Sequence, residues 1–272
     1  QKSYDKGVTW TNGTYFAENN DLSQDKEWAA IDPKTNFIYV VWTEQKSKAG
    51  RESSTTVTDI KFSVSKDLGK TWSRGVQINE KTGANFSEWK SVIGAMPAVG
   101  SNGEVYATWV NYNTFYFDKS LDSGKTWLTK DVKISELNDK WSIKVPGMYR
   151  SYIFPIIAVD NSPGQFNGSI YITWADQIKD SKNTDIWLSK STDKGDTWSK
   201  PIKVNDDSTA RHQYFPWIAV DQANGNLYLV FYDRRNHNDS KTDVYMVKST
   251  DGGKTFTNFK INERSFNPNS ST

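Results

Sequence analysis

The sequence predicts an all-β fold, a β-propeller built of four-stranded antiparallel blades. Three observations lead to this prediction. An eight-residue pattern recurs five times, at intervals of 62, 55, 71 and 58 residues. Short apolar segments bounded by turn residues fill each interval, without a helical period. Aromatic residues make up 14% of the chain although apolar residues make up only 36%, and aromatic side chains favour strands.

The octet has the pattern S-x-D-x-G-x-T followed by Trp or Phe. Its aspartates are Asp5, Asp67, Asp122, Asp193 and Asp251. An Asp side chain accepts hydrogen bonds from backbone N–H groups a few residues on, and Gly adopts positive φ without strain. Catalysis or calcium binding is the functional alternative. We predict structural turns instead, because five equivalent copies cannot all form one active site.

Four short strands are expected in each complete repeat. The first and second strands are expected at 28–32 and 39–42, 95–99 and 106–109, 155–160 and 171–174, and 216–221 and 228–231. A third strand leads into the octet at 60–64, 115–117, 186–188 and 244–247. A fourth leaves the octet at 76–78, 132–134, 202–204 and 259–261. Four such strands per repeat are typical of propeller blades.

The octet is similar to the Asp-box (BNR) repeat of sialidases and related propellers, and this resemblance extends over essentially the whole chain. It implies that each octet joins the third and fourth strands of a blade, away from the active face. We count four complete blades plus one extra fourth strand after the first octet. We therefore expect one domain over residues 1–272, part of a five- or six-bladed ring truncated at one or both ends. The expected blade segments are 1–18, 19–80, 81–136, 137–206 and 207–264, with a tail at 265–272.

Composition excludes several classes of function. The chain has no cysteine, so it has no disulfide framework, thiolate nucleophile or Cys-ligated metal. Its 34 basic and 32 acidic residues give a net charge of +2, which provides no strong field for nucleic acid. No apolar stretch approaches the ~20 residues of a membrane span. We expect a secreted or cell-surface bacterial protein that binds a glycan or protein partner, including other domains or subunits of a surface complex.

One blade concentrates candidate functional groups in two loops that should adjoin on the active-type face. That face carries the connecting loops, which join one blade to the next, and the loops between second and third strands. The candidates for catalysis in this blade are Arg211, Asp233, Arg234 and Arg235, and those for ligand binding are His212, Tyr214, Tyr232 and His237. A guanidinium matches a carboxylate in geometry and charge. The alternative is a solvated loop with a salt bridge to Asp233.

Polar residues also recur two positions after the aromatic residue of each second strand. They are Glu44, Asn111, Asp176 and Asp233. Such a ring at the channel mouth could bind a cation, a water cluster or a ligand. The alternative is that polar residues end each strand where solvent begins. No cofactor or metal motif is present, although a calcium ion is compatible with these groups.

The connecting loop between residues 136 and 152 is unusually long, and long loops in compact domains are often functional. It contributes Trp141, Tyr149 and the catalytic candidate Arg150, and the preceding connecting loop contributes Trp89. Aromatic side chains at a channel mouth favour contact with carbohydrate, although Trp89 could equally belong to the core.

The resemblance to sialidases is strong for the fold and weak for the catalytic residues. Sialidases require three arginines on the substrate carboxylate, a Tyr–Glu nucleophile pair, an Asp acid/base and an Arg-Ile-Pro motif, and this chain contains no Arg-Ile-Pro. One hypothesis is therefore an exported propeller that binds glycan or protein without catalysis. The alternative is an enzyme, a glycoside hydrolase of exo-sialidase type or a polysaccharide lyase, that acts on acidic sugars through the Arg/His/Asp cluster.

Overall fold

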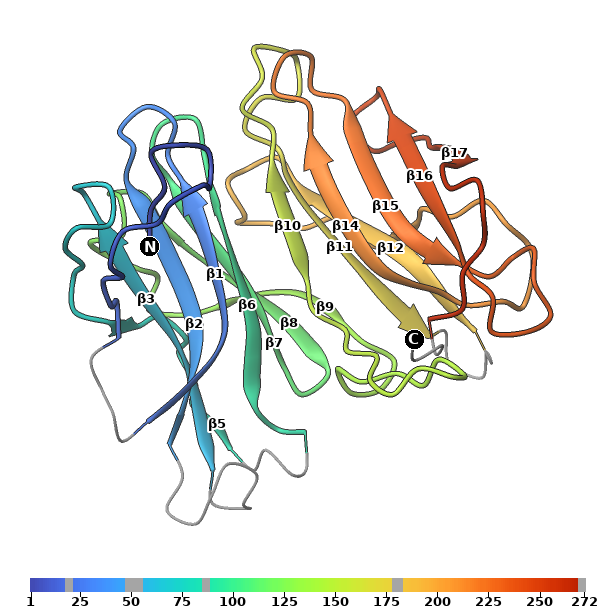
Figure 1. Cartoon of the computed structure of the whole chain (residues 1–272), viewed down its shortest axis with the longest axis horizontal. Coiled ribbons are helices and arrows are strands. Elements are labelled where there is room, and N and C mark those ends of the chain that lie inside the picture. Colours follow the sequence, from blue (N-terminus) through green and yellow to red (C-terminus); the bar gives the residue numbers. More distant parts are fainter. Residues whose placement is uncertain (18–21, 47–55, 85–88, 178–182, 269–272) are drawn as a thin grey trace.

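The computed structural model describes residues 1–17, 22–46, 56–84, 89–177 and 183–268 (Figure 1). The described residues form antiparallel sheets and no helix, which confirms the predicted all-β propeller class. Each of the four sheets takes its strands in chain order, from an inner first strand to an outer fourth strand. No helix in the described part of the chain is long and apolar enough to cross a membrane.

The strand bounds agree with the predicted order and extend most of the predicted segments. The first sheet comprises β1 (Ser23–Ile31), β2 (Ile38–Lys46), β3 (Val57–Ser65) and β4 (Val76–Gln77), with β5 (Gly83–Ala84) paired to β3. The second comprises β6 (Val92–Val99), β7 (Val105–Asn111), β8 (Thr114–Ser120) and β9 (Val132–Glu136). The third comprises β10 (Ile156–Val159), β11 (Ile170–Gln177), β12 (Thr184–Ser191) and β13 (Ile202–Lys203). The fourth comprises β14 (Gln213–Val220), β15 (Leu227–Asp233), β16 (Asp243–Ser249) and β17 (Thr257–Lys260).

The extra strand expected after the first octet is absent from the described residues that directly follow that octet. Residues 11–17 carry no strand, and β5 is a short addition that the sequence did not predict. The segment instead lies against the first sheet, where the ring of Phe16 is 5.0 Å from that of Trp42 and 5.7 Å from that of Trp72. Aromatic packing on an existing sheet face thus replaces strand pairing in this segment.

All five octets form the predicted turns, and the four octets of the complete blades join third and fourth strands. In the fourth copy, Thr197 N donates to Oδ1 of Asp193 at 2.9 Å, and Gly195 N donates to Oγ of Ser191 at 2.8 Å. Equivalent bonds occur in the other four copies. These aspartates therefore satisfy backbone groups of their own turn, as a structural role requires.

In the second and third blades, the octet also docks its blade onto the preceding one. A Cβ atom on Gly195 would lie 2.1 Å from Phe117 of β8, and one on Gly124 would lie 2.3 Å from Phe62 of β3. The octet aromatics Trp127 and Trp198 pack edge-on against these same two phenylalanines, at 4.9 and 5.3 Å. Glycine is thus needed here for close approach as well as for its positive φ.

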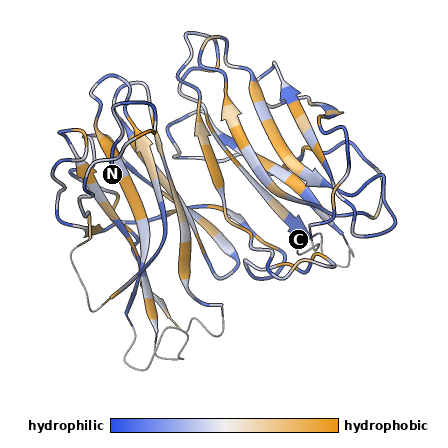
Figure 2. Cartoon of the chain, in the orientation of Figure 1, coloured by the Kyte–Doolittle hydropathy of each residue, from blue (hydrophilic) through white to orange (hydrophobic). Residues whose placement is uncertain are grey.

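Apolar cores lie between consecutive sheets. Neighbouring sheets contact through their inner strands, β6 against β1 and β2, β10 against β6, and β14 against β10 and β11. Buried aliphatic and aromatic side chains fill each interface. Figure 2 shows this division, with hydrophobic residues along the strands and hydrophilic residues in the loops.

The Gly195→Ala variant tests the docking role of the octet. We expect its thermal midpoint to fall by about 5–10 °C, because steric clash with Phe117 adds to left-handed backbone strain. Gly7→Ala is the matched control, since Gly7 has φ of 90° but its added Cβ would lie 3.9 Å from the nearest atom, in Trp10. Calorimetry should show a much smaller shift for this control. Equal shifts would contradict a role for glycine in docking the blades.

Candidate functional site

The connecting loops lie at the lower edge of the molecule in Figure 1, and residues of these loops line two cavities. The octets lie at the opposite edge. Both cavities are lined by Trp89 and by the segment 142–146 of the long connecting loop, so they flank one stretch of chain. We call them the acid hollow, of about 640 Å³, and the loop hollow, of about 660 Å³. Both volumes are in the range of small-ligand sites.

The acid hollow brings together three residues that the sequence singled out separately. Trp89 comes from the loop before β6, Asp176 from the end of β11, and His212 from the loop before β14. The hollow also contains charged residues that the sequence did not single out, namely Asp139, Lys140 and Lys144. The unusual length of their loop was the one sequence feature that pointed to these residues. A single sequence cannot show which residues of a loop face a cavity.

Asp176 is the ionisable group in the acid hollow best suited to proton transfer. Its side chain is 5% exposed, and burial raises the pKa of Asp176 to about 6, with a smaller contribution from the charge of Asp139. Hydrogen bonds oppose this rise: Asn138 donates to Oδ2 from its backbone N at 3.3 Å and from its side chain at 3.1 Å, and Gln177 N donates to Oδ1 at 2.7 Å. A cleft carboxyl that titrates near neutrality can act as a general acid or base.

His212 is a neutral neighbour in the same cavity. Burial, with a smaller contribution from the charge of Arg234, lowers the pKa of His212 to about 4. Its Nδ1 lies 3.3 Å from the hydroxyl of Thr184. His212 therefore contributes hydrogen-bonding groups at neutral pH but no positive charge.

The loop hollow contains two exposed candidates from the long connecting loop. Tyr149 is 92% exposed, and the guanidinium of Arg150 lies 5.4 Å from the centre of its ring. In the acid hollow, the ammonium of Lys140 lies 4.9 Å from the ring of Trp89, which lines both hollows. This face thus combines accessible aromatic rings with cations.

Trp141 and Tyr214 occupy the interior, which departs from the expectation that they contact a ligand. Trp141 is 1% exposed, and its indole N–H donates to the carbonyl of Trp89 at 2.9 Å. Tyr214 is fully buried and bonded to the hydroxyl of Thr242 at 2.9 Å. Both rings support the loops from beneath, because their polar tips find protein partners.

Arg234 is buried beneath the long connecting loop. Its guanidinium donates to the carbonyl of Pro146 at 2.7 Å, to Thr242 at 3.2 Å and to the hydroxyl of Tyr214 at 3.4 Å. These bonds tie the fourth blade to the loop that separates the two hollows. Arg234 therefore positions the wall of the site, and its bonds point into protein.

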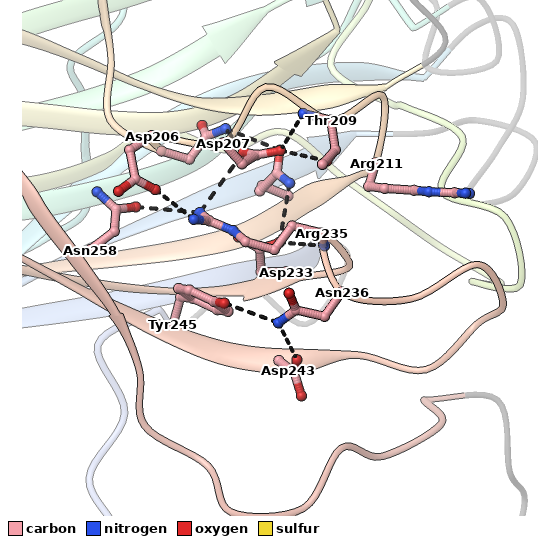
Figure 3. A network of polar contacts seen from close by, with 12 residues as sticks. Asp206, Asp207, Thr209, Arg211, Asp233, Arg235, Asn236, Asp243, Tyr245 and Asn258 are labelled. Carbon is pink, nitrogen blue, oxygen red and sulfur yellow. Dashed lines mark hydrogen bonds and ion pairs between the residues drawn. The ribbon is translucent and has the colours of Figure 1, made fainter.

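Arg235 belongs to an internal ion network (Figure 3). Its Nε donates to Oδ2 of the fully buried Asp233 at 2.8 Å, its Nη1 contacts Asp206, and its plane lies 4.1 Å from the ring centre of Tyr245. Asp206 follows β13 of the third sheet, so the network connects the third and fourth blades. The salt bridge to Asp233 agrees with the structural alternative, but Arg235 is largely buried and does not belong to a solvated loop.

The remaining candidates have separate local partners. Arg211 donates to the side-chain oxygen of Asn238, and in Figure 3 it extends away from the Arg235 network. His237 lies 3.1 Å from Asp243, and the ring of Tyr232 lies 5.3 Å from that of Phe266. With Arg234 and Arg235 also bound internally, these contacts do not assemble the arginines into a carboxylate-binding triad.

The strand-end residues likewise have partners within or beside their own blades. Glu44 forms an ion pair with Lys61 at 3.5 Å, and Asn111 pairs with Thr114 across the turn to β8. Asp176 and Asp233 have the partners described above. Among the described residues, no group of three or more acidic or histidine side chains is placed to hold a metal ion.

Comparison with known proteins supports the architecture. No family model and no curated protein matches the sequence. Among solved structures, the chain is similar to a Hadza microbial sialidase, with 16% identity, 97% of this chain and 52% of the other covered, and a TM-score of 0.57. A Penicillium chrysogenum alpha-L-arabinanase has 12% identity, coverage of 93% and 71%, and a TM-score of 0.62. NanB sialidase from Streptococcus pneumoniae has 11% identity, coverage of 95% and 55%, and a TM-score of 0.58.

The chain thus spans about half the length of the two sialidases. At these identities the similarity shows a shared β-propeller fold. Assignment of chemistry must come from the residues of this chain.

The Asp176→Asn variant tests the environment of the acid hollow. Because folding raises the pKa of Asp176 to about 6, its protonated form stabilises the fold below the unfolded pKa, and this stability is lost as pH rises through 6. We expect the stability of the variant relative to wild type to increase by about 2–3 kcal/mol between pH 4 and pH 8. Urea denaturation across this range measures the difference. A difference independent of pH would contradict the raised pKa.

The Arg235→Gln variant tests the structural role of the ion network. We expect the free energy of unfolding to fall by about 3 kcal/mol, because the buried carboxylate of Asp233 loses its cation. Arg211→Gln is the matched control, since Arg211 bonds a neutral side chain. Urea denaturation should separate the two variants clearly. Unchanged stability of Arg235→Gln would contradict the structural role.

Proposed function

We propose that this chain is a carbohydrate-binding propeller that recognises an acidic glycan at the acid hollow and its neighbouring loop hollow. The observation that carries the proposal is the composition of the acid hollow. Loops from three blades combine the ring of Trp89 with two lysines and the buried carboxyl of Asp176. Aromatic rings stack on the apolar faces of sugars, and a few convergent polar groups set orientation.

Charge favours an acidic ligand. Lys140 and Lys144 line the acid hollow, and Arg150 lines the adjoining loop hollow. The fold similarity to proteins described as sialidases and an arabinanase supports a glycan over other ligands with the same charge. The turn geometry of the octets supports the resemblance to the Asp-box repeat, and we extend the proposal to an exported bacterial protein on that basis. A protein partner on the same face remains the alternative for a binding module.

A second candidate function is cleavage of the bound glycan by a glycoside hydrolase or lyase mechanism. The raised pKa of Asp176 favours it, because a carboxyl protonated near pH 6 can deliver a proton to a leaving oxygen. Asp139 lines the same cavity and is the nearest candidate for a second carboxylate. The arginines give no support to a sialidase-type carboxylate triad, since Arg234 and Arg235 have protein partners.

A glycan array followed by calorimetry tests the binding proposal. We expect acidic oligosaccharides to bind. We expect Lys144→Ala to lower the affinity for the best ligand by about fivefold to tenfold, because a charge-assisted contact is lost. The matched control is Lys254→Ala, which removes an exposed lysine on the octet face. An array with no bound glycan, or equal losses in both variants, would contradict binding at this site. Turnover of the bound glycan that disappears in Asp176→Asn would favour the enzymatic candidate.

A further inference from the structure

A third cavity, of about 410 Å³, lies between the inner strands of the propeller, and we call it the channel pocket. Its wall includes the side chain at one equivalent position in the first strand of every sheet. These side chains are Trp28, Met96, Ile156 and Trp217. Their cross-strand partners are Val41, Thr108, Thr173 and Val230, and each partner directly precedes the aromatic residue of its second strand. The channel pocket is therefore built from one position repeated in four blades.

Bulges aim these positions at the channel. The pairing of inner and second strands shifts between Asp25 and Trp28 in β1, between Ile93 and Met96 in β6, and between Tyr214 and Trp217 in β14. Each bulge contains a left-handed residue, and these are Lys26, Gly94 and Phe215, with φ of 58°, 72° and 53°. For Lys and Phe this conformation is strained, and bulges re-aim side chains beside functional sites.

The channel pocket is aromatic and open to solvent. Trp28 and Trp217 are 43% and 39% exposed, and their ring centres lie 5.0 Å apart across the first and fourth sheets. Phe215, which is 40% exposed, continues the same wall. Core residues of this size are normally buried, so partial exposure of three large rings at one cavity indicates a surface for an apolar ligand.

A positively charged side chain lies where the channel pocket meets the loop hollow. Arg150 and Tyr152 line both cavities. Arg150 is exposed, and within the described residues its guanidinium forms no ion pair and lies over the ring of Tyr149. Among the polar side chains of the pocket wall, Arg150 is therefore the one suited to bind a carboxylate or sulfonate.

We propose that the channel pocket binds a small amphipathic anion, with its apolar ring system packed against Trp28 and Trp217 and its acidic group on Arg150. Charge complementarity at Arg150 and the aromatic walls identify this class of ligand. A sugar ring fits less well, because the walls offer few groups for its hydroxyls. The site is separate from the acid hollow, and its assignment does not depend on glycan binding.

Titration of the full chain with 2-naphthoate, observed by saturation-transfer NMR, tests this proposal. We expect a dissociation constant of about 1 mM or tighter for a ligand of this size. Trp217→Ala should weaken binding by about tenfold, and Arg150→Gln by about fivefold to tenfold. Neutral 2-naphthamide should bind wild type more weakly and should not respond to Arg150→Gln. The control is Trp10→Ala, which removes a tryptophan that is 62% exposed in the first octet.

Absence of naphthoate binding, or equal binding by wild type and both pocket variants, would overturn the proposal. Loss of binding in Trp10→Ala to the same extent would indicate adsorption to exposed tryptophans and would also overturn it. Arg150 is exposed, so Arg150→Gln keeps the test valid if Trp217→Ala fails to fold. The probe carries no sugar, so a lack of naphthoate binding would not contradict the glycan proposal. Likewise, a glycan array with no bound glycan would not contradict the proposed anion site in the channel pocket.

Discussion

The close approach of two octet glycines, Gly124 and Gly195, to a phenylalanine of the preceding blade is the constraint on which the rest of the structure depends. At Gly124 and Gly195 no Cβ atom fits, so the turn can lie directly on the phenylalanine ring. The adjacent Trp127 and Trp198 cover the same rings. This contact sets how near one sheet lies to the next at one edge of the molecule. The geometry of the sheets then determines the positions of the inner strands and of the loops at the opposite edge.

This arrangement separates stability from binding chemistry in space. The octets use their aspartates to satisfy backbone groups, whereas the opposite edge carries loops whose side chains are not all needed by the fold. Arg234 and Arg235 mark the boundary between the two roles, because both are charged loop residues bound within protein. The groups left for ligands are Trp89, Asp176 and the cations of the long connecting loop.

Much of the architecture could be predicted from the sequence, because the octet period and the apolar segments repeat. The face that carries Trp89, Asp176 and His212 could also be predicted from strand order. Burial of Trp141 could not, since the same loop position suits a core residue and a ligand contact. The internal pairing of Arg235 depends on Asp206, which lies in another blade. The bulges of the inner strands have no signal in one sequence, because two of the three left-handed residues are Lys26 and Phe215.

The central claim is that ligands bind on the loop face, around the acid hollow and the loop hollow. Hydrogen–deuterium exchange with and without an acidic oligosaccharide mixture tests it most directly. The account predicts slower exchange in residues 139–152 and around Asp176 and His212, with no change in the octets. Slower exchange confined to the octet face, or no change anywhere at saturating oligosaccharide, would contradict it.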